Sequence, residues 1–233
     1  MKGHGFLNRF ALSVPCALFV LLLPSPFGAA FTQSTHLSSQ QSIARFSQAD
    51  LDGWEPERFL GETVYRFTQE ASKGTVLCAE SHAAASGLIR KIQVDLTRTP
   101  YLNWSWKIDQ VLVRHDEKTK QGDDYPARVY VIIHGGVFFW QTKAVNYVWA
   151  GRARAESIWS NPYAGDNVKM IAVESGNSRK GLWQSEKRHV IEDLERAFGE
   201  PLTHIDAVAI MTDTDNTKAR AQACYGDIFF SAD

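Results

Sequence analysis

Short stretches in which apolar and polar residues alternate recur through most of the chain. From Leu88 to Leu96, for example, Leu88, Ile92 and Val94 fall on one side of an extended chain, with Arg90 as the exception. A period of two residues indicates a β-strand with one buried face. Strands are predicted in the same way over residues 63–67, 75–79, 101–108, 127–134, 138–140, 146–150, 168–173, 207–211 and 225–230.

One segment has the period of a helix instead. Within residues 183–198, Val190, Leu194 and Phe198 recur at helical spacing among charged residues, and Gly199 is suited to end the helix. Because the strands do not alternate with helices, the pattern argues against a parallel α/β sheet. We predict an all-β fold with one helix, a two-sheet β-sandwich of jelly-roll type.

The first 30 residues lack this alternation. Lys2 and Arg9 give a basic start, residues 10–23 are apolar apart from one serine and one proline, and a run of small residues ends at Ala30. The apolar run is shorter than the about 20 residues that a membrane-spanning helix needs. Residues 1–30 are therefore predicted to be a cleavable signal peptide, the alternative being an uncleaved anchor. The protein is expected to be periplasmic or secreted.

Residues 31–45 are rich in serine, glutamine and threonine and are predicted to be a flexible leader before a single β-sandwich domain, residues 46–233. Loss of the signal peptide changes the formal net charge from −1 to −3, because that segment carries Lys2 and Arg9 and no acidic residue. A weakly acidic chain without a basic cluster argues against nucleic acid as a partner. No transmembrane segment is expected after signal cleavage.

Two cysteines, Cys78 and Cys224, remain when Cys16 is removed with the signal peptide. In an oxidising compartment such a pair can form a disulfide, which would tie an early strand to the last one. The alternative is two separate buried thiols, since the sequence does not show whether the two Cβ atoms meet.

Several phrases of the chain occur in an order that is similar to one bacterial family. They are Trp104–Lys107, Gly122–Tyr130, Tyr147–Trp149, Asn161-Pro162, Trp183–Glu186, Phe198-Gly199, Met211–Thr217 and Tyr225–Ile228. Together they resemble the family called "domain of unknown function 3047" over nearly all of the chain after the signal peptide. The resemblance implies an exported β-sandwich similar to galactose-binding-like jelly rolls. It implies no established activity.

An acidic loop directly follows the apolar strand at residues 207–211. Asp213, Asp215 and Asn216 place three side-chain oxygens within four residues, a donor set that suits a hard cation such as Ca²⁺. The alternative is a turn in which Asp and Asn bond their own backbone. Asp227, in the last predicted strand, is a further metal candidate by analogy with sugar-binding jelly rolls.

A second polar cluster lies in the turn before the strand at 127–134. Asp123 and Asp124 precede Arg128, and Asp124 shares the strand parity of Arg128, so these two side chains are predicted to pair. Such a loop can form the rim of a ligand site. The alternative is an ion pair at the surface or at an interface.

Aromatic residues are frequent, with 7 Trp and 7 Tyr. An exposed ring can stack on the apolar face of a sugar while nearby polar groups bond its hydroxyls. The candidates for stacking are Trp104, Trp106, Trp140, Trp149, Trp159 and Tyr163. Trp159 and Tyr163 flank the loop at Asn161 and are predicted to be exposed, whereas Trp104 and Trp106 are predicted to lie in the core.

These observations favour a non-catalytic binding domain for carbohydrate or cell-envelope glycan. The predicted ligand-binding residues are Asp123, Asp124, Arg128, Trp149, Trp159, Asn161 and Tyr163. No nucleophile–base pair, phosphate loop or zinc motif can be named, so no catalytic residue is assigned. The alternatives are a glycan hydrolase or lyase that uses Asp124 or Asp213, and a structural envelope protein that binds other proteins. Convergence of the acids and Arg128 in space would support a site.

Overall fold

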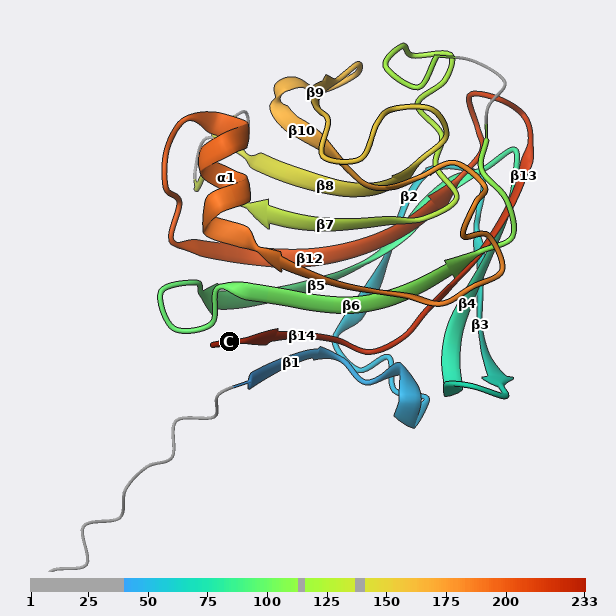
Figure 1. The fold of residues 1–233 in the computed structure, drawn as a ribbon, viewed down its shortest axis with the longest axis horizontal. Helices are drawn as coiled ribbons and strands as arrows, with labels where there is room; N and C mark the ends of the chain where they lie inside the picture. The colour runs from blue at the N-terminus through green and yellow to red at the C-terminus, as the bar shows by residue number, and fades with distance from the viewer. Residues whose placement is uncertain (1–39, 113–115, 137–140) are drawn as a thin grey trace, which may run out of the picture. The chain divides into compact units, whose positions relative to one another are not determined.

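The computed structural model describes residues 40–112, 116–136 and 141–233 (Figure 1). Within these residues the strands form two sheets of seven strands each. The predicted β-sandwich with one α-helix is confirmed for this part of the chain. The predicted signal peptide (1–30), most of the predicted leader (31–39) and the predicted strand at 138–140, with Trp140, lie outside the described residues.

The first sheet contains both the first and the last described strand. Its order is β1-β14-β6-β13-β4-β3, and β11 pairs with the other edge of β6. The bounds are β1 Gln40–Ala44, β3 Val64–Glu70, β4 Gly74–His82, β6 Tyr101–Ile108, β11 Gln184–His189, β13 Arg220–Tyr225 and β14 Ile228–Ser231. A short 3₁₀-helix, η1, Phe46–Gln48, follows β1.

The second sheet has the order β2-β5-β12-β7-β8-β10-β9. Its bounds are β2 Trp54–Leu60, β5 Ala85–Asp95, β7 Arg128–Ile133, β8 Lys143–Ala150, β9 Ile158–Asn161, β10 Gly165–Ser175 and β12 His204–Asp213. The pairing is antiparallel except between β8 and β10, which are parallel. Adjacent side chains along a strand point to opposite faces, so each strand of this sheet gives one face to the core and one to the outside.

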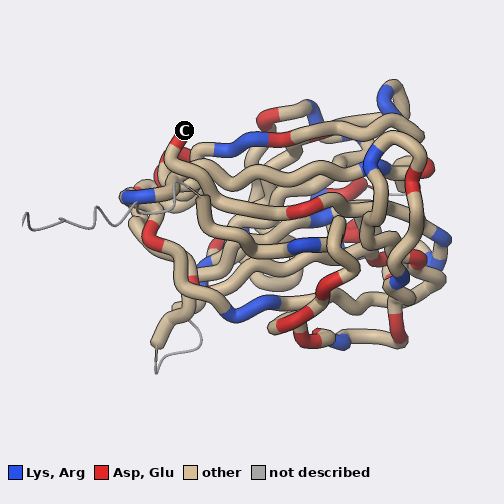
Figure 2. Tube along the Cα trace, turned by 90° about the horizontal axis from the view of Figure 1, so that it is seen from below, with Lys and Arg blue, Asp and Glu red and all other residues tan. Residues whose placement is uncertain are grey.

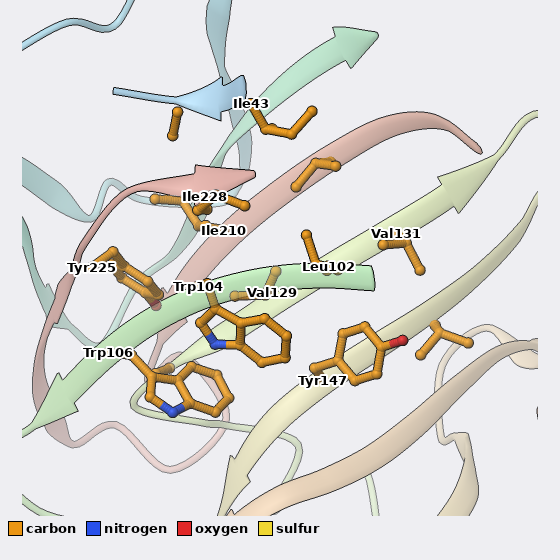
Figure 3. Close-up of a cluster of buried hydrophobic side chains, with 14 of the residues drawn as sticks. Ile43, Leu102, Trp104, Trp106, Val129, Val131, Tyr147, Ile210, Tyr225 and Ile228 are labelled. Atoms are coloured by element: carbon orange, nitrogen blue, oxygen red, sulfur yellow. The ribbon is translucent and has the colours of Figure 1, made fainter. Parts of the chain in front are cut away.

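The core lies between the two sheets and is built around aromatic side chains (Figure 3). Trp104 and Trp106 of β6 are buried, as predicted, and contact each other edge to face with ring centroids 5.3 Å apart. Tyr147 of β8 comes from the opposite sheet and its ring lies 5.4 Å from that of Trp104. Rings from both sheets therefore interdigitate, as the packing of a β-sandwich requires.

The helix is shorter than predicted. Residues 184–189 form β11, which pairs with β6, and α1 covers only Val190–Phe198. The predicted apolar spacing is confirmed within α1, where Val190 and Leu194 are buried, and Gly199 ends the helix with a positive φ of 76°. The correction has a physical reason: the segment before α1 exchanges backbone hydrogen bonds with β6, a long-range pairing that local periodicity does not reveal.

Other element boundaries also differ from the predictions. The predicted flexible leader (31–45) contains β1, because its backbone pairs with β14 and Ile43 is buried. The predicted strand at 225–230 is two strands, β13 and β14, which are separated at Gly226 and Asp227. Two edge strands, β2 and β9, were not predicted; β2 contains Pro56, a residue that sheets tolerate at an edge.

The predicted disulfide is present and links neighbouring strands of the first sheet. Cys78 of β4 lies directly opposite Cys224 of β13, and their sulfur atoms are bonded. The bridge joins positions 146 residues apart in the sequence. It therefore closes most of the described chain into one covalent loop.

Charged residues of both signs are interspersed along the chain (Figure 2). None of the helices that the described residues form is long and apolar enough to cross a membrane.

Candidate functional site

A cavity of about 470 Å³ lies on the outer face of the second sheet. Arg128 and Tyr130 of β7 line it, whereas Val129 and Val131, which alternate with them, belong to the core. The cavity is therefore on the side turned away from the first sheet. Its lining residues are Phe59, Ala85, Asp123, Arg128, Tyr130, Asn161, Tyr163, Ala164, Val168, Met211, Asp213, Asp215 and Asn216.

Arg128 is the central buried cation of this cavity. Its side chain is only 4% exposed, and it binds both carboxylate oxygens of Asp213. The register explains this pairing: Met211 of β12 lies opposite Arg128, and Asp213 follows two residues later on the same face. The guanidinium also lies over the ring of Tyr125, with its carbon 4.4 Å from the ring centroid. A planar, bidentate pair of this kind fixes both side chains.

Asp123 is held at the side of the same cavity. Arg128 Nη2 donates to its backbone carbonyl at 2.5 Å, and Asn161 Nδ2 donates to its Oδ2 at 3.0 Å. The other oxygen, Oδ1, is buried, has no hydrogen-bond donor among the described residues, and lies 3.7 Å from Arg128 Nη1. Asp123 is thus a positioned acceptor with unused capacity.

Asp124 does not pair with Arg128, which corrects the prediction. Residues 123–125 precede β7 and are not part of a strand, so strand parity does not apply to them. Instead, the Asp124 carboxylate accepts hydrogen bonds from the backbone N–H groups of Asn216 and Thr217, at 3.1 and 2.5 Å. Asp124 therefore holds the acidic loop in place from a distant part of the sequence.

Three of the acids singled out in the sequence come together in space. One carboxylate oxygen each of Asp124, Asp213 and Asp215 can be chosen so that all three lie within 4.8 Å of one another. Ca²⁺ takes about six to eight oxygen ligands, whereas this group offers three carboxylates. Asp124 and Asp213 already accept hydrogen bonds on both oxygens. The residues present therefore fit a calcium ion poorly as they stand, and we derive no role for one.

Asp227 lies apart from this group. Its two carboxylate oxygens accept hydrogen bonds from the backbone N–H and the hydroxyl of Ser47, at 2.7 and 2.6 Å. These bonds attach η1 to the connection between β13 and β14. Asp227 therefore has a structural role in the first sheet. It does not line the cavity and does not join the other acids that were predicted to bind a metal.

The acids of the cavity have raised pKa values. Burial raises the pKa of Asp213, against the opposing effect of Arg128, whose two hydrogen bonds favour the charged carboxylate. Burial likewise raises the pKa of Asp123, again against Arg128. The pKa of Asp215 is raised by burial and then by the neighbouring Asp124 carboxylate. The folded protein therefore binds protons at this site more tightly than the unfolded chain does.

This difference predicts a pH dependence of stability. Because these acids hold protons more tightly in the folded state, their contribution to the free energy of unfolding should fall as the pH rises above about 5. Asp215→Asn should make this fall shallower, since it removes one titrating group and its repulsion with Asp124. Urea unfolding of wild type and Asp215→Asn at several pH values measures this dependence of the free energy of unfolding on pH. Asp166→Asn is the control: Asp166 is exposed and its pKa is lowered by Lys169, so it acts only at lower pH. A wild-type stability that rises over this range would contradict the assignment.

Tyr163 and Asn216 form the outer rim of the cavity. Tyr163 is 57% exposed, which confirms its predicted exposure. Its hydroxyl accepts a hydrogen bond from Asn216 Nδ2 at 2.7 Å and donates to the Lys120 carbonyl at 3.2 Å. Asn161 Oδ1 accepts from the backbone N–H of Tyr163 at 2.9 Å. The ring is thus anchored at both ends, and the ammonium group of Lys120 lies over it, 5.1 Å from the ring centroid.

Two predicted stacking residues do not line the cavity. Trp149 is fully buried in the core, and its Nε1 donates to the Gly176 carbonyl at 3.1 Å, so it cannot contact a ligand. Trp159 is half-buried against the small cluster that includes Val148 and Met170. Seven of the eight residues of β8 are buried, because both faces of this strand are covered. The sequence of β8 therefore does not indicate which face Trp149 occupies.

Six residues that line the cavity were not among the predicted site residues: Phe59, Ala85, Tyr130, Ala164, Val168 and Met211. Phe59, which is 69% exposed, lies on the unpredicted strand β2. Tyr130 and Met211 lie on the predicted strands β7 and β12. Tyr130 could have been found, because it is two residues from Arg128 and therefore shares its face. Phe59 lies at a register shift between β2 and β5, which no local pattern reveals.

Comparisons with known proteins give similar folds at low sequence identity. The family 11 carbohydrate-binding module of the cellulosomal cellulase Lic26A-Cel5E of Clostridium thermocellum is 8% identical, with a TM-score of 0.45; the match covers 82% of this chain and 94% of that one. The xyloglucanase domain of NopAA, a type three effector from Sinorhizobium fredii, is 7% identical, with a TM-score of 0.42, and the match covers 82% and 96%. No curated protein sequence matches the chain significantly.

The sequence model of one protein family matches residues 52–229, which is more than half of the chain. The family carries the description "protein of unknown function (DUF3047)". Its match spans every strand from β2 to β13. The chain therefore belongs to the DUF3047 family, as the order of its sequence motifs predicted.

Proposed function

We propose that this protein is an exported, non-catalytic domain that binds neutral or amino-containing glycans in the cavity beside Arg128. One observation carries the proposal: a single cavity of about 470 Å³ joins accessible aromatic rings to fixed polar groups. Tyr163 and Phe59 offer apolar surface for the face of a sugar ring, while Asp123 and Asn216 are placed to bond hydroxyls. The bridged cysteines support export, because disulfides persist in oxidising compartments.

The charge of the cavity supports a choice among glycans. Asp123, Asp213 and Asp215 line it and Arg128 is the single cation among its lining residues. Arg128 is already bound by Asp213 on both oxygens, so it has little capacity left for a ligand carboxylate. A uronic acid or sulfate group would meet like charges in a partly buried site, an unfavourable arrangement. A hydroxyl or an ammonium group would not be repelled by the acidic side chains of the cavity.

Binding is favoured over glycan cleavage by the state of the acids. Hydrolases need one carboxyl free to donate a proton and a second to act as base or nucleophile. Both oxygens of Asp124 accept backbone hydrogen bonds, and both oxygens of Asp213 are bonded to Arg128. These are the two residues on which the hydrolase or lyase alternative depends. The geometry assigns them to holding the site together.

A glycan microarray that includes neutral, amino and acidic glycans tests this proposal. We expect binding to neutral or amino glycans, and little to sulfated or uronate-rich ones. Tyr163→Ala should weaken binding about tenfold, the effect of losing one stacked ring. Leu182→Ala is the matched control, because Leu182 is also a large exposed apolar residue, 60% exposed, outside the cavity. Absence of any glycan signal, or equal effects of the two variants, would refute the proposal.

A further inference from the structure

A second, smaller cavity adjoins the first on the same face of the second sheet. It has a volume of about 110 Å³ and shares Phe59, Tyr130 and Met211 with the first cavity. Its other lining residues are Glu57, Gly87, Leu88, Ile89, Ile132, Ala209 and Ile210. Because three residues line both, the two cavities form one continuous groove across β7, β12, β5 and β2.

The second cavity lies where two central positions of the sheet, Gly87 and Ala209, carry little or no side chain. Gly87 of β5 lies opposite Glu57 on one side and Met211 on the other. A Cβ atom on Gly87 would lie 2.6 Å from the Ile210 carbonyl oxygen, so this position accommodates only glycine without rearrangement. Ala209 lies opposite Ile89 and Tyr130 in the next row. A flat apolar strip therefore runs between Phe59 and Tyr130.

Phe59 is the side chain that both cavities share at the edge of the sheet. It falls between Arg58 and Leu60, where the register of β2 against β5 shifts. Such a bulge directs a side chain away from regular pairing, and the Phe59 ring is 69% exposed. A single exposed ring at the junction of two cavities is suited to contact two successive units of one ligand.

We propose that the ligand is an unbranched neutral oligosaccharide that spans both cavities, with one unit at Asp123 and Arg128 and later units over Tyr130 and Met211 toward Phe59 and Glu57. This inference rests on the proposed function. It adds that the ligand has at least two units and that they lie one after the other across the two cavities. The polar groups of the first cavity suit the hydroxyls of one unit, and the apolar strip suits the ring faces of the next.

Calorimetric titration of the full chain with cello-, xylo- and N-acetylchito-oligosaccharides of one to six units tests this inference. We expect affinity to rise with length by at least about tenfold over the first few units of one series and then to level off. Phe59→Ala should remove most of this gain and, because Phe59 also lines the first cavity, should weaken the shortest bound oligomer as well. Glu57→Gln, which alters only the second cavity, should affect only the longer oligomers. Leu182→Ala should affect none.

The outcomes separate the two proposals. If no oligomer of any series binds, the proposed function itself fails. If oligomers bind with an affinity that does not depend on length, the cavity beside Arg128 is a glycan site and the extended groove is wrong. Sedimentation of wild type and Phe59→Ala provides a further check: a wild-type dimer that Phe59→Ala dissociates would show that a second copy, not a glycan, occupies the strip.

Discussion

Arg128→Met is expected to destabilise the folded protein by about 3–5 kcal/mol, the range observed when one partner of a buried ion pair is removed. The side chains of Arg128 and Asp213 are 4% and 3% exposed, so the remaining carboxylate cannot recover its hydration. The substitution also removes the donor to the Asp123 carbonyl and the contact with the Tyr125 ring. Urea unfolding, followed by tryptophan fluorescence, measures the loss.

A second variant separates the loss of a charge partner from the loss of packing. Arg128→Met combined with Asp213→Leu replaces the whole pair by apolar groups and should recover part of the stability, because no charge is then left unpaired. Arg58→Ala is the matched control: Arg58 pairs with Glu62 at the surface, both more than half exposed, and such pairs contribute about 0–1 kcal/mol. A loss below about 1 kcal/mol for Arg128→Met would show that the pair does not hold the adjacent ends of β7 and β12 together.

The strands that were predicted correctly are those whose signal is local. Trp104 and Trp106 alternate with polar residues on β6, and this pattern alone places both rings in the core. The prediction of a helix over residues 184–189 was wrong for the opposite reason. The alternation of this segment is weak, and its strand conformation results from pairing with β6, about 80 residues earlier in the chain. Local patterns therefore predict an element where burial decides its structure, and fail where a distant partner does.

The candidate site shows the same division. Asp123 and Asp213 are both candidates from the sequence, and whether they converge is a question that the sequence leaves open. The structure brings them together because Asp213 ends β12, Asp123 precedes β7, and these two strands lie side by side. Which acid binds Arg128 depends on the register of Met211 against Arg128, and a shift of one residue would move Asp213 to the other face. The register of β12 against β7 cannot be predicted from the sequence of either strand alone. The choice of Asp124 as the partner was wrong because it relied on strand parity, which does not apply before β7 begins at Arg128.

Removal of the disulfide is expected to have an effect of similar size, by a different mechanism. The bridge joins residues 146 positions apart, and in the chain-entropy account a cross-link over such a loop restricts the unfolded state by about 4–5 kcal/mol. We therefore expect Cys78→Ser with Cys224→Ser to lower the melting temperature by roughly 10 °C or more. Reduction of the wild-type protein should give the same result, and the reductant should not change the double variant.

The mechanism can be checked apart from the size of the effect, because it acts on the unfolded chain. Without the bridge the unfolded chain is less compact, so the dependence of the unfolding free energy on urea concentration should become steeper. Cys78 and Cys224 lie on β4 and β13 of the first sheet, whereas the groove lies on the second. Below the unfolding transition, the reduced protein should therefore keep its glycan affinity. A loss of affinity before any unfolding would mean that the bridge positions the site itself, and unchanged stability on reduction would mean that the hydrogen bonds and packing of the two strands suffice without it.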